Sequence, residues 1–379
     1  MAFGVYVHVP FCASRCDYCD FATWTDRAHL VDAYVDACVA DVERRRARGD
    51  LPDATSVFFG GGTPSLLPAD RLVRILDAIP RAPGAEVTVE CNPDSVDGDK
   101  LAVYRAGGVD RVSLGVQSMR SHVLRALGRT HDPANVARAI AAARDAGFAR
   151  VSVDLIYGVP GETLDDWRAT VLDALALGPD HVSAYALTVE PGTPLGRMVA
   201  AGERPAPDDD DQADKYLLAD DLLASAGFAW YEISNWARPG QECRHNRLYW
   251  DGGEYVGIGC AAHGHTAGRR WWNVRTPDRY IDLVSREELV EAGGEFLDPA
   301  TRADEVFALA LRTRCGAPLP VAHRARERVH ALAADGLVVV DDGRIRLTTR
   351  GRLLASAVTV DLLAAGAAAA PGVATAGTR

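Results

Sequence analysis

Short β-branched runs alternate with longer amphipathic segments over the first half of the chain. Six runs have the length and composition of buried strands, and five longer segments between them have helical periodicity. The expected strands are 4–9, 56–60, 86–91, 111–116, 151–156 and 181–187, and the expected helices are 29–47, 69–79, 97–106, 133–147 and 163–177. Such βα alternation predicts an α/β fold with a parallel sheet, either barrel-like or doubly wound.

Polar residues and glycines stand where several of these strands end. They are Tyr6, His8, Gly60–Thr63, Glu90, Gln117, Asp154 and Tyr185. In parallel α/β folds the carboxyl ends of the strands form the functional face, so these side chains could converge on one ligand. The alternative is that polarity simply resumes where a strand gives way to a loop.

The alternation stops after Pro191. The segment GERPAPDDDDQ (202–212) is expected to be an exposed linker whose four aspartates begin a helix. A region rich in aromatic residues and glycine follows, and after it two strands flank Asp342–Gly343 as in a hairpin. We therefore expect four parts: an α/β domain over 1–200, an extension over 201–295, a winged-helix-like α+β domain over 296–366 and a disordered tail over 367–379.

Composition limits the class of function. The length of 379 residues allows two or three domains, and the net charge of −11 argues against a nucleic-acid partner. No stretch approaches the ~18 apolar residues of a membrane span, and the N-terminus lacks the features of a secretory signal. The cytoplasm is therefore the expected location. Eight cysteines are too few for a disulfide scaffold of this length.

Three of those cysteines lie close together. Cys12, Cys16 and Cys19 form a CxxxCxxC motif on the loop after the first expected strand. Three thiolates can hold an iron–sulfur cluster and leave one iron open to a small molecule, whereas structural zinc requires a fourth ligand nearby. Cysteines 38, 91 and 243 do not supply that ligand by spacing alone. A cluster is the preferred hypothesis, and zinc is the alternative.

The motif and its surroundings resemble the radical S-adenosylmethionine (SAM) superfamily. The segments YVHVPFCASRCDYCDF, FFGGGTPS, ECNPDS, SLGVQS, LGRTH, VDLIYGVPGET and YALTVEPGTPL look like its branch of oxygen-independent coproporphyrinogen oxidases and related heme chaperones. Together they cover residues 5–195. The resemblance implies a partial (β/α)6 barrel that carries a [4Fe-4S] cluster held by Cys12, Cys16 and Cys19, with SAM on the open iron.

The resemblance also assigns roles to the residues at the strand ends. Tyr6 and Tyr18 would flank the nucleotide-bound cluster, and the loop of Gly61, Gly62 and Thr63 would pass against the methionine end of SAM. The polar residues that would hold the ribose, methionine and adenine groups are Glu90, Gln117, Arg129 and Asp154. Carboxylates suit hydroxyl and ammonium donors, and arginine suits a carboxylate. A surface role for Arg129 is the alternative.

Two departures separate the chain from the oxidases it resembles. Phe21 stands where those enzymes have a further cysteine, and Cys12 is too close to Met1 to leave room for their N-terminal extension. Both features are typical of the heme chaperones. The segment HNRLYW, which begins at His245, resembles the HNxxYW motif of those chaperones, and this makes His245 a candidate heme ligand. His263 and His265 could form a second wall of the pocket.

The preferred hypothesis is a heme chaperone that binds heme and passes it to heme-dependent proteins, with SAM bound and not necessarily turned over. The alternative is an enzyme that decarboxylates coproporphyrinogen III to protoporphyrinogen IX, and a radical methyltransferase is a third. The resemblance also allows a homodimer and a transient contact with membrane-bound respiratory enzymes. Nothing in the sequence chooses among heme acceptors.

Overall fold

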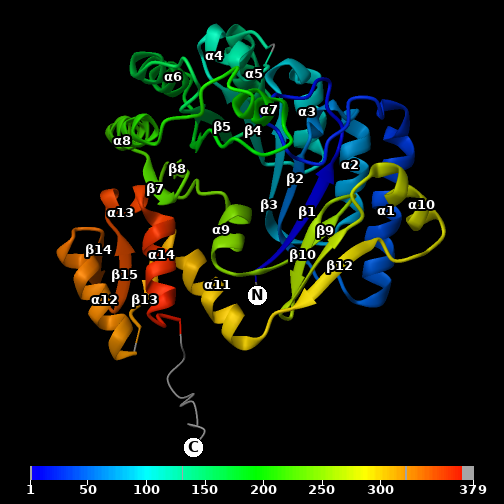
Figure 1. The fold of residues 1–379 in the computed structure, drawn as a ribbon. Coiled ribbons are helices and arrows are strands. Elements are labelled where there is room, and N and C mark those ends of the chain that lie inside the picture. The colour runs from blue at the N-terminus through cyan, green and yellow to red at the C-terminus, as the bar shows by residue number, and fades with distance from the viewer. Residues whose placement is uncertain (1, 130, 321, 369–379) are drawn as a thin grey trace, which may run out of the picture.

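The computed structural model of the chain describes residues 2–129, 131–320 and 322–368. All six expected strands are present, and they lie side by side in chain order with parallel pairing. Their bounds are β1 Phe3–Val9, β2 Ala54–Gly61, β3 Arg81–Cys91, β4 Arg111–Gln117, β5 Arg150–Tyr157 and β6 His181–Ala186. The prediction of an α/β fold with a partial barrel is confirmed (Figure 1).

The five expected helices are also present, and a sixth, short helix was not predicted. The helices are α1 Val31–Arg48, α2 Ala69–Ala78, α3 Gly98–Ala106, α4 Ser121–Ala126, α5 Pro133–Asp145 and α6 Leu164–Ala176. Local sequence fixes where several of them begin. Thr163 and Asp166 form a reciprocal capping box at the start of α6, and Asp132 caps α5 just before a proline in its first turn.

The two faces of the sheet differ sharply in polarity, because successive side chains of a strand point to opposite sides. One face is apolar and buried against the helices: Val5, Val57 and Val87 lie in one row across three strands and are essentially unexposed. The next rows on the opposite face carry polar side chains instead, such as Ser56 beside Glu86. The inner face is therefore lined by groups that can bind a ligand, and helices cover the outer face.

The region 201–295 widens this sheet at both edges. Strands β7 Ala229–Glu232 and β8 Asn235–Ala237 follow β6, while β9 Glu254–Ile258 pairs parallel with β1 and is followed by β10 His263–Thr266, β11 Arg269–Asn273 and β12 Glu291–Phe296. The result is one twelve-stranded sheet. Between these strands lie α8 Asp209–Ser225, α9 Arg244–Trp250 and α10 Pro277–Ser285, after the short α7 Pro194–Ala200.

The aspartate run begins a helix as expected. The side chain of Asp208 accepts a hydrogen bond from the Asp211 amide, and the next three aspartates occupy the first turn of α8. Carboxylates at this end of a helix are stabilised by its dipole. The expected linker is therefore shorter than 202–212, because α8 takes its last four residues.

The C-terminal part has its own small sheet and core. Its elements are α11 Pro299–Leu311, β13 Ala317–Pro318, α12 His323–Ala334, β14 Val338–Asp341, β15 Arg344–Leu347, α13 Thr349–Leu353 and α14 Ala355–Ala364. The expected hairpin joins β14 to β15 through Asp342 and Gly343, both with positive φ as a type I′ turn requires. Most of the expected tail, from residue 369 onward, lies outside the described residues.

A buried arginine ties this C-terminal part to the main sheet. Arg352 of α13 donates to Asp220 of α8 at 2.9 Å and to the Tyr216 hydroxyl at 3.2 Å, and it stacks over the ring of Trp230. In Figure 1 the orange and red C-terminal elements lie next to α8 and β7 accordingly. Across the described ranges no helix combines the length and apolar character needed to cross a membrane.

Candidate functional site

The CxxxCxxC motif lies on the loop that follows β1. Backbone hydrogen bonds between Cys12 and Trp24, and between Trp24 and Pro10, close this loop into a compact turn beside the sheet. The three cysteine side chains are partly exposed and carry no disulfide. Burial raises the pKa of the Cys12 thiol, so binding to a metal would have to release its proton.

These cysteines line a cavity of about 780 Å³ at the carboxyl ends of the parallel strands, which we name the cysteine cavity. All twelve residues expected for the cluster and SAM lie around it: Tyr6, Cys12, Cys16, Tyr18, Cys19, Gly61, Gly62, Thr63, Glu90, Gln117, Arg129 and Asp154. They come from the ends of β1 to β5 and the loops that follow. The structure thus brings together residues that are up to 148 positions apart, counted from Tyr6 to Asp154.

Two glycines at the end of β2, Gly61 and Gly62, allow the backbone to approach β1 and the cysteine loop. A Cβ atom on Gly62 would lie 2.7 Å from the carbonyl oxygen of Phe11 and 3.1 Å from Cys12 Sγ. Gly61 has a φ of 107°, and a Cβ atom there would meet the His8 ring at 2.4 Å. A side chain at Gly62 would therefore displace the cysteine loop, and one at Gly61 would displace the ring of His8.

Two carboxyl groups face the cavity, Glu90 from β3 and Asp154 from β5, with β4 between them. Burial, followed by the charge of Asp154, raises the pKa of Glu90 to about 8, and burial raises the pKa of Asp154 to about 6. Ser113 donates to Asp154 at 3.0 Å, and the Gly61 amide donates to Glu90 at 3.3 Å. A cationic ligand would favour the charged form of both groups, so this wall suits an ammonium or sulfonium ligand.

Arg129 is partly buried beside the cysteines, and its polar contacts do not fit the alternative of a purely surface role. Its Nη2 donates to the carbonyl of Gly115 at 2.9 Å, its Nη1 lies 3.5 Å from Cys16 Sγ, and its buried Nε has no partner among the described residues. Gln117, the last residue of the strand β4 that also carries Gly115, has a φ of 62° at an irregularity in the pairing of β4 with β5. Backbone strain of this kind is concentrated at ligand sites.

The cysteines fit a cluster better than a single metal ion. Within the described ranges, no three His, Cys, Asp or Glu side chains converge as ligands of one ion. Structural zinc gathers its four ligands around one ion, whereas a [4Fe-4S] cluster is held by cysteines bound to different irons. Three separate thiols along one cavity wall, next to a cradle that only glycine permits, agree with a cluster.

A second cavity, of about 1010 Å³, lies on the neighbouring part of the inner face. We name it the aromatic cavity; its lining includes Phe21, Tyr249, Tyr255, Trp272, His8, His263, His265, Arg270, Arg275 and Arg302. Tyr6, Asp20 and Phe21 line both cavities. Most of these arginines and aromatics were not singled out from the sequence. The signal that could have found them is the alternation in HGHTAGRRWWN, which places His263, His265, Arg270 and Trp272 on one face of a hairpin.

His245 lines neither cavity, so its surroundings do not favour the expected role as a ligand of heme iron, which stays a prediction. The side chain is 1% exposed, and both ring nitrogens are used: Nδ1 is 2.9 Å from the Ser56 hydroxyl and Nε2 is 2.9 Å from the Tyr249 hydroxyl. The ring also stacks on Phe58. His245 therefore anchors α9 to β2, and the residue of this helix that reaches the aromatic cavity is Tyr249.

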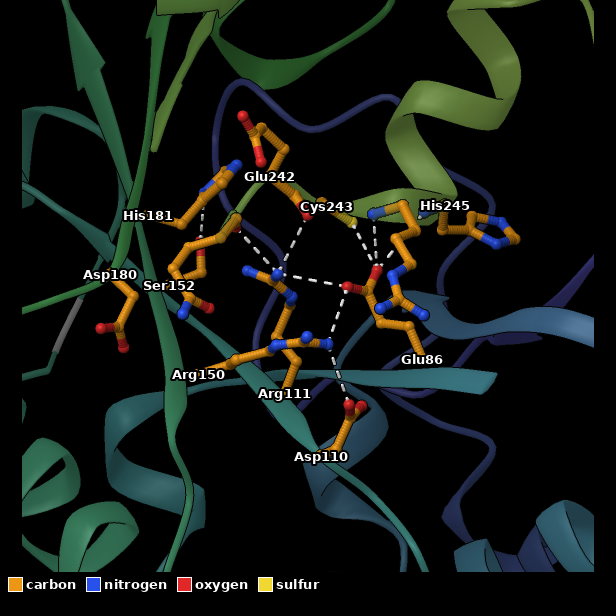
Figure 2. Close-up of polar contacts among 12 residues, drawn as sticks. Glu86, Asp110, Arg111, Arg150, Ser152, Asp180, His181, Glu242, Cys243 and His245 are labelled. Atoms are coloured by element: carbon orange, nitrogen blue, oxygen red, sulfur yellow. Dashed lines mark hydrogen bonds and ion pairs between the residues drawn. The ribbon is translucent and has the colours of Figure 1, made fainter. Parts of the chain in front are cut away.

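A buried charge network holds the start of α9 in place, as Figure 2 shows. Glu86 accepts hydrogen bonds from the Arg244 amide at 2.7 Å and from Arg111 Nη2 at 3.2 Å. Arg111 also donates to the backbone carbonyl of Gln241 at 2.9 Å. Both Glu86 and Arg111 are 1% exposed. Arg111 is the first residue of β4, so the network lies at the amino-terminal end of that strand, and Arg111 also lines the cysteine cavity.

Comparisons with known proteins agree with this site. The radical SAM superfamily model matches residues 6–174. The chain is 49% identical to the heme chaperone HemW of Mycobacterium tuberculosis over 370 residues, 95% of each chain. It is 32% identical to HemW of Bacillus subtilis over 369 residues, 94% of this chain and 97% of that one.

One solved structure has the same architecture along nearly the whole chain. The coproporphyrinogen III oxidase HemN from Escherichia coli, a radical SAM enzyme, matches with a TM-score of 0.83 over 95% of this chain and 90% of that one. Its sequence identity is 24%, so this likeness establishes the fold alone. With the cysteine cavity in place and relatives of up to 49% identity matched over almost their full length, the chain belongs to the HemW family of heme chaperones within the radical SAM superfamily.

Proposed function

We propose that this protein is a heme chaperone that binds heme, acts in the cytoplasm and passes heme to heme-dependent proteins. The observation that carries the proposal is the pair of cavities on one face of one sheet. The cysteine cavity has the donors for a cluster and SAM, and the aromatic cavity has the apolar walls, imidazoles and arginines that suit a porphyrin with carboxylate side chains.

In the cysteine cavity, Cys12, Cys16 and Cys19 would hold three irons of a [4Fe-4S] cluster. When bound, the cluster and SAM would together supply reductive cleavage of the sulfonium. The residues of the chain act mainly by binding and positioning. Glu90 and Asp154 offer carboxylates to cationic or hydroxyl groups, and Arg129 is fixed by the Gly115 carbonyl so that it can pair with a carboxylate.

In the aromatic cavity, Tyr249, Tyr255 and Trp272 would cover the apolar faces of heme. The cavity volume lies at the upper end of the ~300–1,000 Å³ typical of small-molecule sites. Phe21, in the position where the oxidases have a further cysteine, is 61% exposed and lies between the two cavities. An exposed aromatic side chain at this partition supports heme binding there.

The proposal extends to the acceptors and the assembly. We include respiratory heme proteins as acceptors, reached by transient contact with membrane-bound complexes, and a homodimer as the working form. These parts are supported by the family resemblance. Co-sedimentation with vesicles that carry a heme-free respiratory complex, and sedimentation velocity with and without heme, test them separately.

The central experiment is an anaerobic absorption titration of the cluster-reconstituted protein with heme, followed by addition of apomyoglobin. A saturable Soret shift at one heme per chain, followed by transfer to apomyoglobin, supports the chaperone. In parallel, the same preparation is incubated with coproporphyrinogen III, SAM and reductant. Protoporphyrinogen IX formation without heme binding would replace the proposal with the oxidase alternative.

A further inference from the structure

The aromatic cavity contains three histidines, and their hydrogen bonds distinguish them. His8 has no free lone pair: Nε2 is 2.9 Å from the Ala22 carbonyl, which fixes the proton there, and Nδ1 is 3.1 Å from the Tyr6 hydroxyl. His265 has Nδ1 3.4 Å from the Gly253 carbonyl, and its Nε2 is covered by the protein. Neither ring presents an accessible nitrogen to the cavity.

His263 differs from both. It is the first residue of β10, its side chain is exposed, and its ring makes no hydrogen bond to any other described residue. It lies across the hairpin from Trp272, with ring centroids 6.2 Å apart and planes tilted by 35°. Partial desolvation of the ring, followed by the charge of the neighbouring Arg270, lowers the pKa of His263 and so favours the neutral imidazole at neutral pH. A neutral imidazole is the form that ligates iron.

The arginines of the cavity also differ from one another. Arg270 is already paired with Glu295 at 2.6 Å and Glu305 at 2.7 Å. Arg275 and Arg302 are exposed at the cavity, and among the residues that the structure describes neither has a carboxylate partner within ion-pair distance. Two free guanidinium groups match the two carboxylates of heme in number and charge.

Resting on the proposed function, we propose that His263 is the protein ligand to the heme iron and that Arg275 and Arg302 pair with the two heme propionates. Heme then lies in the aromatic cavity, against the Trp272 ring and the exposed face of β10. His245 of the HNxxYW motif contributes by holding α9, and hence Tyr249, at the wall of the same cavity.

The iron ligand is tested by anaerobic heme titration of His263→Ala, His265→Ala and His330→Ala. His330 is an exposed histidine of α12 that lines neither cavity, so its variant is the matched control. His263→Ala should lose the Soret and resonance Raman signature of imidazole ligation and bind heme at least roughly tenfold more weakly, since losing even an outer-shell partner of a metal ligand costs about 10–100-fold. Free imidazole should restore the signature. His265→Ala should keep the signature of imidazole ligation, and His330→Ala should match the wild type in both signature and affinity.

The carboxylate contacts are tested with heme and its dimethyl ester. The wild type should prefer heme by roughly tenfold, and the double variant Arg275→Gln/Arg302→Gln should lose most of that preference. Equal urea midpoints for all variants would show that they are folded. An unchanged spectrum and affinity in His263→Ala, or loss of ligation in His265→Ala alone, overturns the assignment while heme binding stands. If the wild type binds no heme, the proposed function itself fails.

Discussion

Replacing His245 by alanine should destabilise the fold and leave the iron ligation of bound heme unchanged. The substitution removes a buried ring and leaves the Ser56 and Tyr249 hydroxyls without their partner. An unsatisfied buried polar group costs about 1–3 kcal/mol, and truncation of a large buried side chain costs about 2–5 kcal/mol. Because these costs overlap, we expect a loss of about 3–6 kcal/mol, a large part of the ~5–15 kcal/mol of a typical domain.

The same residue should make the wild type sensitive to acid. Burial lowers the pKa of His245 to about 3, against an ordinary value of 6.5. Between these two values the unfolded chain binds a proton that the folded protein excludes, so stability is complete above pH 6.5 and falls as the pH decreases toward 3. At pH 5 this one group should cost ~2 kcal/mol relative to neutral pH. Replacing His245 with a residue that does not titrate removes this pH-dependent loss of stability.

Urea unfolding at pH 7.5 and pH 5 measures both effects. His245→Asn keeps an amide near the Nδ1 position that faces Ser56 and should lose less stability than His245→Ala at pH 7.5. Both variants should show a smaller difference between the two pH values than the wild type does, and His330→Ala should behave as the wild type. The reasoning would be refuted by an alanine variant that unfolds at the wild-type urea concentration yet loses the imidazole signature of heme.

Three further outcomes follow from the structure. Glu90→Gln should flatten the fall in stability of the metal-free protein between pH 5 and 8. The raised pKa of Glu90 makes its protonated form stabilise the fold at low pH, and this stabilisation is lost as the pH rises through about 8. Urea midpoints measured across that pH range check this. Gly62→Ala should lower the iron and sulfide bound per chain after anaerobic reconstitution, because its Cβ atom would displace the loop at Cys12, while Gly49→Ala, open at the end of α1, should not. Arg352→Met should lower the free energy of unfolding by about 1–3 kcal/mol, because the partly buried Asp220 loses its charge partner and keeps only the Trp236 indole N–H. Denaturant unfolding would show this loss, and equal stability would mean that the ion pair contributes nothing.

The parallel part of the fold was predictable because its signals are local. The strands from β1 to β6 contain short β-branched runs, and α3, α5 and α6 each begin at a side-chain cap. The closeness of the residues at the strand ends then follows from topology, because the carboxyl ends of parallel strands meet at one edge of the sheet. This is why all twelve residues expected for the cluster and SAM line one cavity, although the family resemblance was needed to select them among other polar residues.

The extension could not be derived in the same way. Its strands are short and rich in glycine and aromatic residues, and β9 pairs with β1 across about 250 residues of chain, which no local pattern encodes. The surroundings of His245 could not be derived from the sequence for a related reason. A histidine next to aromatic residues has the same local sequence whether it faces a ligand or a buried hydroxyl. Here Gly4 of β1 leaves room for the ring and Ser56 of β2 supplies its hydrogen-bond partner, and both are far from His245 in the sequence.

The shared lining of the two cavities explains how a cluster can matter to a protein that carries heme. Asp20 and Phe21 follow Cys19 directly, and with Tyr6 they form the partition between the cavities. The backbone at Cys19 makes its hydrogen bonds within the same loop: its amide donates to the Cys16 carbonyl, and its carbonyl accepts from the Arg15 guanidinium. A ligand that fixes Cys19 therefore restricts the two residues after it. The conformational entropy of these residues is then lost when the cluster binds, so that heme binding does not have to order them again. In this arrangement the cluster can favour heme binding by a structural effect alone.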